Sequence, residues 1–188
     1  MTNILIVGVG GQGIILAADV LAEMLVEQGF DVKEAEIHGM SQRGGSVHSM
    51  IRYGKSIASP LITEGSADFL LAFEELEALR WASYAKKDAR IIVNRQQIPP
   101  VPVAVGLAEY PADPLGELRS RFDKVVDVDA IQVAKKAGDI RAANVAILGV
   151  LARSMPFDKA CWLEAIEHRV PPKTLEINRK AFLSGWDA

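Results

Sequence analysis

Apolar runs alternate with polar, glycine-rich or proline-rich segments along the chain, and this pattern predicts alternating strands and helices. Short β-branched runs indicate buried strands, whereas apolar positions spaced roughly three or four residues apart indicate helices. The predicted strands are residues 4–7, 31–37, 47–53, 68–73, 90–94 and 124–128. The predicted helices are residues 13–28, 74–84, 115–122, 130–137, 142–153, 158–168 and 173–183.

The strand–helix–strand order of the middle section predicts a parallel sheet with right-handed crossovers. We therefore expect an α/β fold: a Rossmann-like three-layer sandwich with a mostly parallel sheet, helices on both faces and a helical C-terminal segment. No repeat, low-complexity segment or linker divides the sequence, so residues 1–188 are expected to form a single domain with helices 142–185 packed on it. The helix at residues 142–153 is almost wholly apolar and must be buried in the domain or against a partner, which leaves a homodimer through this helix open.

Residues 96–114 differ in character from the rest of the chain. Five of the nine prolines lie there, which argues against a central strand or a long helix. Residues 101–105 are still expected to form a short edge strand, because proline is tolerated at the edge of a sheet.

Charge and cysteine content exclude several classes of protein. A net charge of -3 with no basic cluster argues against nucleic-acid binding, and no segment reaches the ~20 apolar residues of a membrane span. The first strand begins at the N-terminus without room for a signal peptide, so a cytoplasmic protein is expected. The one cysteine, Cys161, excludes an internal disulfide and a self-contained iron–sulfur cluster or cysteine-rich zinc site, and it is interpreted as a small buried hydrophobe.

A glycine-rich turn, G-V-G-G-Q-G at Gly8–Gly13, joins the first strand to the first helix. Its G-x-G-x-x-G spacing is typical of turns that place a nucleotide or phosphate at a helix N-terminus, because glycine permits sharp bends and close backbone approach. A purely structural tight turn explains the same spacing. Glu34 and Glu36 lie near the distance at which a dinucleotide-binding protein holds a ribose, although alternating charges on a half-exposed strand are also common.

The segment after the second strand departs from an ordinary dinucleotide-binding fold. It is a polar, glycine-rich loop rather than a helix, and its residues are Gly39, Met40, Ser41, Gln42, Arg43, Gly44, Gly45 and Ser46. Its donors can converge on an anion, since a guanidinium binds a phosphate or carboxylate in a fork. A surface turn with a solvated arginine remains the alternative. The flanking His38 and His48 could titrate near neutrality but are interpreted as structural or surface residues.

Together these motifs resemble the gamma subunit or gamma domain of the 2-oxoacid:ferredoxin oxidoreductases, with the small (beta) subunit of indolepyruvate:ferredoxin oxidoreductase as the nearest type. The likeness covers essentially the whole chain, and the G-M-S-Q-R-G-G segment is its specific part. The motifs in order are G-V-G-G-Q-G at Gly8–Gly13, E-I-H-G-M-S-Q-R-G-G-S-V at Glu36–Val47, A-D-F-L-L-A-F-E at Ala67–Glu74, A-N-V-A-I-L-G at Ala143–Gly149 and N-R-K-A-F-L-S-G at Asn178–Gly185.

The resemblance implies a non-catalytic subunit of an enzyme that oxidatively decarboxylates a 2-oxoacid, such as indolepyruvate or another aryl pyruvate, to an acyl-CoA. Thiamine diphosphate, Mg²⁺ and iron–sulfur clusters are then expected on a large partner subunit, with electrons passing to ferredoxin, and the isolated chain is expected to be inactive. By the same likeness, residues 39–46 would contact the partner near the cofactor and coenzyme A region. Gly8, Gly10, Gly11, Gln12 and Gly13 would line a neighbouring anion pocket. The alternatives are a free-standing nucleotide- or flavin-binding protein and an interaction module without a ligand.

Overall fold

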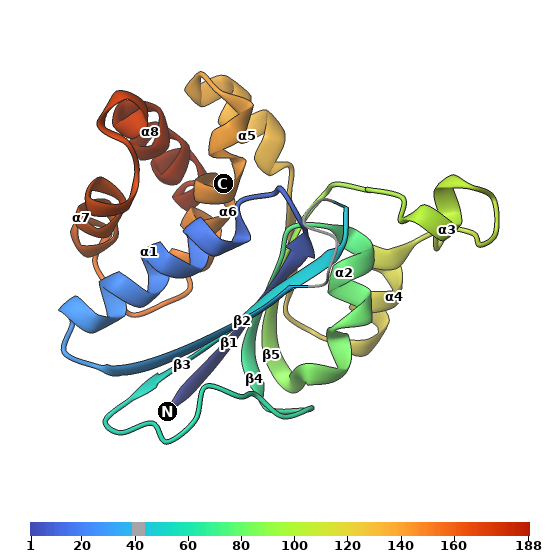
Figure 1. The fold of residues 1–188 in the computed structure, drawn as a ribbon, viewed down its shortest axis with the longest axis horizontal. Coiled ribbons are helices and arrows are strands. Elements are labelled where there is room, and N and C mark those ends of the chain that lie inside the picture. The colour runs from blue at the N-terminus through green and yellow to red at the C-terminus, as the bar shows by residue number, and fades with distance from the viewer. Residues whose placement is uncertain (39–43) are drawn as a thin grey trace.

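The computed structural model describes residues 1–38 and 44–188, and of residue 38 it describes the main chain alone. Six strands form one sheet in the order β2-β3-β1-β4-β5-β6 (Figure 1). The strands are β1 (Thr2–Val9), β2 (Asp31–His38), β3 (Ser46–Gly54), β4 (Ala67–Ala72), β5 (Ala85–Asn94) and β6 (Val125–Val128). All six strands predicted from the apolar runs are present.

Most strands of the sheet run in the same direction. β1 pairs in parallel with β4, β4 with β5 and β5 with β6. β3 lies between β2 and β1 and is antiparallel to both. Among the strands described here, β3 is thus the one that runs against the others, which confirms the predicted mostly parallel sheet.

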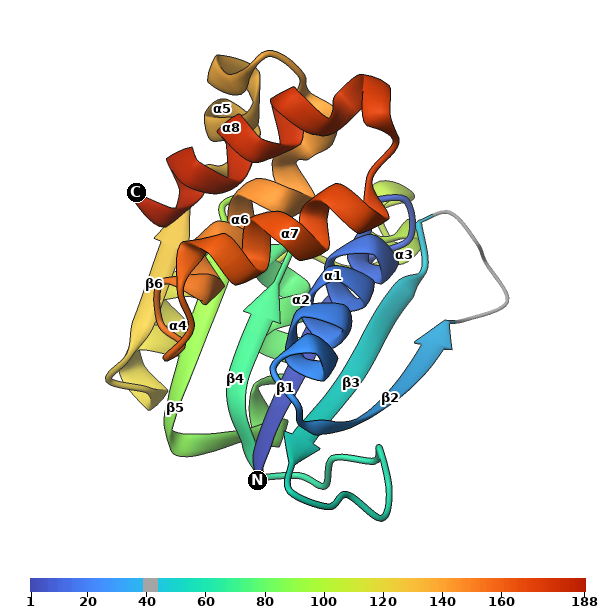
Figure 2. The same cartoon turned by 90° about the vertical axis from the view of Figure 1, so that its left-hand side faces the viewer.

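Helices cover both faces of the sheet, as Figures 1 and 2 show. The helices and short 3-10 turns are α1 (Ile14–Glu27), α2 (Glu75–Arg80), η1 (Ala82–Tyr84), α3 (Val101–Ala104), α4 (Pro114–Arg121), α5 (Ala130–Ala137), η2 (Ile140–Ala142), α6 (Ala143–Ala152), α7 (Lys159–Arg169), η3 (Pro172–Thr174) and α8 (Leu175–Trp186). α1 and α5 to α8 lie on one face, and α2 and α4 lie on the other. The predicted three-layer sandwich is confirmed.

The two hydrophobic cores follow from the alternation of side chains along β1. Ile4 and Ile6 point into the core beneath α1 and α6, whereas Leu5 and Val7 point into the core beneath α2. All four side chains are fully buried. A strand covered on both faces needs apolar residues at every position, which explains the continuous apolar run in the sequence.

α6 and α8 pack closely through two glycines. A Cβ at Gly149 would overlap the carbonyl oxygen of Phe182, and a Cβ at Gly185 would overlap the carbonyl oxygen of Ala146. The residues of α6 from Asn144 onward are buried within this chain. The predicted apolar helix is therefore covered inside the domain, and its face is not available for pairing with a second copy.

The proline-rich segment differs from the sequence prediction. Residues 101–105 were expected to form an edge strand, but Val101–Ala104 is a helical turn, α3. Pro100 caps this turn with an extended backbone and Pro102 lies in its first turn, where the missing N–H has no intrahelical acceptor to lose. Proline is favoured in the first turn of a helix as well as tolerated at a sheet edge, and here the helical turn forms.

Two helices also differ in their bounds from the sequence prediction. The helix predicted over residues 74–84 divides at Trp81 into α2 and η1, and the last helix begins at Leu175 after a short 3-10 turn. Within the described ranges, no helix combines the length and the apolar character needed to cross a lipid bilayer.

Candidate functional site

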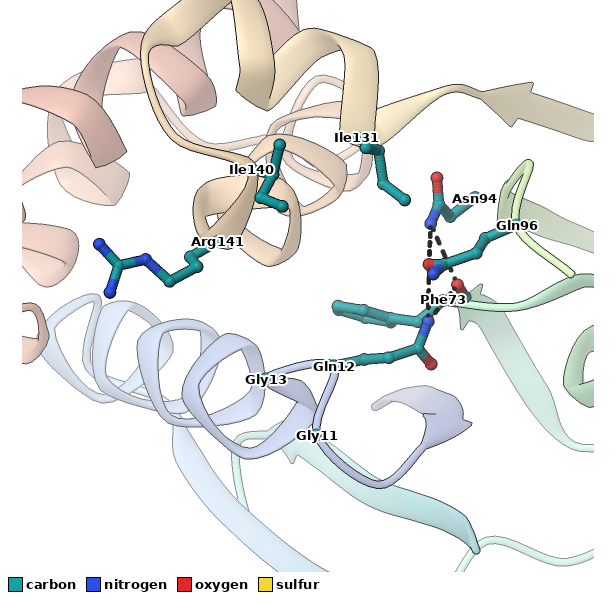
Figure 3. Close-up of a pocket in the computed structure, with 9 residues that line it drawn as sticks. All are labelled: Gly11, Gln12, Gly13, Phe73, Asn94, Gln96, Ile131, Ile140 and Arg141. Atoms are coloured by element: carbon teal, nitrogen blue, oxygen red, sulfur yellow. Dashed lines mark hydrogen bonds between the residues drawn. The ribbon is translucent and has the colours of Figure 1, made fainter. Parts of the chain in front are cut away.

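The topology opens a crevice between the carboxyl ends of β1 and β4. The chain leaves β1 through α1 on one face of the sheet and leaves β4 through α2 on the other face. Ligands of α/β sheets bind at such a switch point because the two connections diverge there. A pocket of about 300 Å³ lies at this point, and Figure 3 shows its lining: Gly11, Gln12, Gly13, Phe73, Asn94, Gln96, Ile131, Ile140 and Arg141.

Three glycines of the predicted turn are needed for different physical reasons. A Cβ on Gly8 would lie 2.6 Å from the Gln12 Oε1 and 2.8 Å from the Phe73 Cβ, so this position requires close approach. Gly11 and Gly13 have φ angles of 102° and 78°, in the left-handed region that side-chain-bearing residues disfavour. The turn therefore needs glycine for packing at its start and for backbone conformation at its end.

The Gln12 side chain is used within the protein. Its Oε1 accepts a hydrogen bond from the Val9 N–H at 2.7 Å. Its Nε2 donates to the Phe73 carbonyl oxygen at 2.8 Å and to the Gln96 Oε1 at 2.9 Å (Figure 3). Gln12 thus holds the ends of β1 and β4 together from inside the turn.

Asn94 completes this network and was not predicted as a site residue. Its Nδ2 donates to the Phe73 carbonyl oxygen and to the Gln96 Oε1, both at 3.1 Å. Its Oδ1 accepts from the Ala130 N–H at the start of α5, at 3.0 Å. The signal in the sequence was a polar residue directly after the apolar run of β5, at the edge where α/β proteins place their ligands.

The N-terminus of α1 opens onto the pocket. The first N–H groups of a helix lack intrahelical acceptors, and the N-cap residue, Gly13, has no side chain to accept from them. The Gly13 carbonyl oxygen accepts from the Asn144 Nδ2 at 3.2 Å, which fixes this end of α1 to α6. Such an N-terminus favours an anion.

Arg141 is the cation that lines the pocket. It is paired with Asp139, whose pKa the guanidinium hydrogen bonds lower. In Figure 3 the guanidinium points away from Gln12 and Gln96. Arg141 therefore lies at the rim of the pocket, and its charge is balanced by the carboxylate of Asp139.

The end of the second glycine loop lies directly beside the first turn. The Gly10 N–H donates to the Gly45 carbonyl oxygen at 2.8 Å, and Val9 is paired with Ser46 in the β1–β3 register. The antiparallel pairing of β3 with β1 brings the start of β3 to the carboxyl end of β1, so both glycine segments meet at one edge. The remaining predicted contact residues, Gly39, Met40, Ser41, Gln42 and Arg43, lie outside the residues that the structure describes.

Three glutamates at the start of α2 form a buried acidic group: Glu74, Glu75 and Glu77. The sequence analysis predicted a helix here but did not predict that these carboxylates are buried. Glu77 accepts from the Ser46 hydroxyl at 2.5 Å and from Arg80 at 2.7 Å. Glu74, only 1% exposed, accepts from the Ile98 N–H, the Glu77 N–H and the Tyr110 hydroxyl. Burial and the hydrogen bond to Glu74 raise the pKa of the Tyr110 phenol. These carboxylates anchor neighbouring segments to the site edge.

Three further residues considered in the sequence analysis lie apart from the pocket. Glu34 is in the middle of β2, two strands away from β1, where it accepts from the Ser49 hydroxyl at 2.8 Å and burial raises its pKa. His48 is buried against the Trp81 ring, with ring centroids 4.0 Å apart, and burial lowers its pKa. Glu36, on the same strand as Glu34, is also absent from the described pocket lining. The ribose-binding role considered for these glutamates has no support in this geometry.

The residues of this chain do not fit an iron–sulfur cluster. Such a cluster needs several thiolates, whereas the sequence has one cysteine, Cys161, which is partly buried against the core on α7. The buried carboxylates of α2 are satisfied by N–H and O–H donors of the protein. The described pocket lining consists of glycine backbone, carboxamides, apolar side chains and Arg141, which can bind and position a group.

Comparison with solved structures shows the same fold. The gamma subunit of a keto/oxoacid ferredoxin oxidoreductase from Geobacter sulfurreducens superposes with a TM-score of 0.74 at 24% identity, over 100% of this chain and 97% of that chain. A 2-oxoglutarate:ferredoxin oxidoreductase from Magnetococcus marinus, with 2-oxoglutarate, coenzyme A and succinyl-CoA bound, gives a TM-score of 0.75 at 19% identity. That match covers 99% of this chain but 30% of the longer Magnetococcus chain.

Sequence comparison shows the family. The profile of the pyruvate ferredoxin/flavodoxin oxidoreductase family matches residues 3–188. Indolepyruvate oxidoreductase subunit IorB of Thermococcus kodakarensis is 40% identical over 193 aligned residues, which cover 99% of this chain and 95% of that protein. The chain therefore belongs to the pyruvate ferredoxin/flavodoxin oxidoreductase family as an oxidoreductase subunit, which confirms the family predicted from its motifs.

Proposed function

We propose that this chain is the small, non-catalytic subunit of an indolepyruvate-type oxidoreductase, which decarboxylates aryl pyruvates to acyl-CoA and passes the electrons to ferredoxin. The likeness to IorB over nearly the whole of both chains is the observation that carries this proposal. The larger subunit would hold thiamine diphosphate, Mg²⁺ and the iron–sulfur clusters, since this chain lacks the thiolates for a cluster.

The carboxyl edge of the sheet is the face we assign to the larger subunit. Two glycine segments meet there, joined by the hydrogen bond between Gly10 and Gly45. The Gln12 carboxamide shapes the turn from inside, so a ligand or partner at this edge would meet main-chain N–H groups. We assign residues 39–46 to the contact near the partner's cofactor, and the glycine turn at 8–13 to the neighbouring anion pocket.

The anion that fits this pocket is a phosphate group of coenzyme A. The N-terminus of α1 offers N–H groups and a positive dipole end to a phosphate. The Magnetococcus relative was solved with coenzyme A bound, and its chain contains a region of this fold. The acyl acceptor would then be held between this subunit and the catalytic partner, which performs the chemistry.

The geometry disfavours the free-standing nucleotide- or flavin-binding alternative. In a dinucleotide fold both strands beside β1 are parallel to it, whereas here β4 is parallel and β3, on the other side, is antiparallel. The acidic residue expected to hold a ribose lies two strands away, on β2.

Reconstitution tests the proposal. The chain and its larger subunit would be produced separately and together, and ferredoxin reduction would be followed with indolepyruvate and coenzyme A. We expect activity from the pair and from neither part alone. Full activity of the larger subunit without this chain would contradict the proposal, as would the absence of a stable complex between the two.

A further inference from the structure

An uncharged segment stands out from the body of the molecule between β5 and α4. Residues 96–108, Q-Q-I-P-P-V-P-V-A-V-G-L-A, carry no ionisable side chain, although about a quarter of the whole chain is charged at 24%. This segment, called the arm below, contains α3. Figure 1 shows α3 standing away from the sheet beyond α2.

The start of the arm, and Tyr110 two residues beyond its end, are fixed to buried carboxylates at the N-terminus of α2. The Ile98 N–H donates to the Glu74 Oε1 at 2.9 Å, and the Tyr110 hydroxyl donates to the same oxygen at 2.5 Å. The Gln97 Nε2 adds a bond of 2.8 Å to Glu75. A buried carboxylate is costly to leave without donors, so these bonds strongly favour one position for the base of the arm.

The arm is also closed on itself. The N–H groups of Leu107 and Ala108 donate to the Pro102 carbonyl oxygen at 2.8 Å and 3.1 Å. Prolines restrict the unfolded conformations of such a segment and so lower the entropy cost of ordering it. The arm is therefore preorganised, and a partner that binds it pays little of the usual cost of ordering a loop.

The tip of this preorganised arm exposes large apolar side chains to solvent. Val101, Val105 and Leu107 are 72%, 61% and 83% exposed. Single exposed apolar residues are ordinary, but three within seven residues, on a rigid and uncharged protrusion, match the composition of an interface core. The absence of charge indicates an apolar receiving surface rather than an acidic or basic one.

We propose that residues 96–108 are a docking arm that places Val101, Val105 and Leu107 in an apolar socket of the larger oxidoreductase subunit. This inference rests on the proposed function. The larger subunit is the occupant because the arm is continuous with the face assigned to it. The arm starts at Gln96, whose Oε1 accepts from Gln12 and Asn94 inside the site network.

A double variant, Val101→Ser with Leu107→Ser, tests the arm in the full chain. The matched control is Leu61→Ser, because Leu61 is 57% exposed in a connector at the opposite end of the sheet. All three proteins are expected to melt at the same temperature, since the altered side chains contact solvent. The dissociation constant of the complex with the larger subunit would be measured, together with ferredoxin reduction across a titration of this chain.

We expect the double variant to weaken the complex by about tenfold or more, as removal of interface anchors does, and the control to leave it unchanged. Activity at saturating variant should reach the wild-type plateau, because the arm contacts no reacting group. If the double variant binds like wild type while the wild-type complex is active, the arm assignment fails and the proposed function stands. If wild type forms no complex, both fail. If the double variant only converts a dimer of this chain to a monomer, the occupant is a second copy and the assignment is wrong.

Discussion

At the scale of single residues, side chains around the pocket fix the backbone rather than face a ligand. Gln12 is bonded to Val9, Phe73 and Gln96, and Asn94 reaches the same carbonyl of Phe73. Asn94 is buried, and leaving a buried polar group without its partner costs about 1–3 kcal/mol, so this carboxamide holds the site edge firmly. These side chains shape the turn, and an anion at the site proposed above would be met by the N-terminus of α1.

Two histidines allow a residue-scale test of the electrostatics. Burial lowers the pKa of His48 below its ordinary 6.5, whereas hydrogen bonds to Glu23 and Glu27 raise the pKa of His168. The neutral form of His48 therefore contributes stability above pH 6.5 that is lost as pH falls through its lowered pKa. The charged form of His168 contributes stability below pH 6.5 that is lost as pH rises through its raised pKa.

A histidine NMR titration measures both values directly. We expect the resonance assigned to His48 to titrate below 6.5 and that of His168 to titrate above it, with His48→Gln and His168→Gln providing the assignments. A reversed order of the two midpoints would show that the burial of His48 or the pairing of His168 with α1 is wrong.

At this scale the sequence predicted the glycine turn but not the side-chain hydrogen bonds around it. The glycine spacing at 8–13 identified the turn, because left-handed and tightly packed positions restrict residue type strongly. Asn94 and Glu74 were not recognised as anchors, since their partners are main-chain atoms of segments distant in sequence. Such contacts produce no short sequence motif from which they could be predicted.

At the scale of elements, close contact between α6 and α8 holds the C-terminal helices on the sheet. This contact depends on the absence of a Cβ at two positions, Gly149 and Gly185, where backbone atoms of the opposite helix take that space. Trp162 and Phe182 fill the neighbouring core and are fully buried. The two helices therefore separate if either glycine acquires a side chain.

Gly149→Ala tests this packing. Its new Cβ would overlap the Phe182 carbonyl oxygen and lie 2.8 Å from the Trp186 nitrogen, so neither neighbour can move without shifting α8. We expect the free energy of unfolding to fall by about 3 kcal/mol, the upper end for overpacked cores, when measured by urea denaturation. Ser184→Ala on the exposed side of α8 is the control and should change stability by less than about 0.5 kcal/mol. A Gly149→Ala protein as stable as this control would refute the close contact.

Elements were largely predictable because their signals are local. The apolar runs of the strands and the glycine after α1 at position 29, with a φ of 81°, marked boundaries correctly. The edge strand at residues 101–105 was wrong, because Pro100 and Pro102 suit a first helical turn as well as a sheet edge. The antiparallel direction of β3 became visible only in the structure, since strand direction depends on pairing between segments.

At the scale of the whole molecule, the fold gathers the segments of the proposed binding face at one edge of the sheet. The glycine turn, the end of the second glycine loop and the base of the arm are linked there through Gly10, Gln12 and Glu74. The connector at residues 55–66 lies at the opposite end of the sheet. We therefore expect one end of the sheet to face the larger subunit and the opposite end to face away from it.

Hydrogen–deuterium exchange of the chain, free and bound to the larger subunit, tests this assignment most directly. We predict that binding slows exchange in peptides covering residues 8–16 and 96–108, while peptides covering residues 55–66 exchange at the same rate. Protection confined to residues 55–66, with residues 8–16 and 96–108 unchanged, would contradict the account.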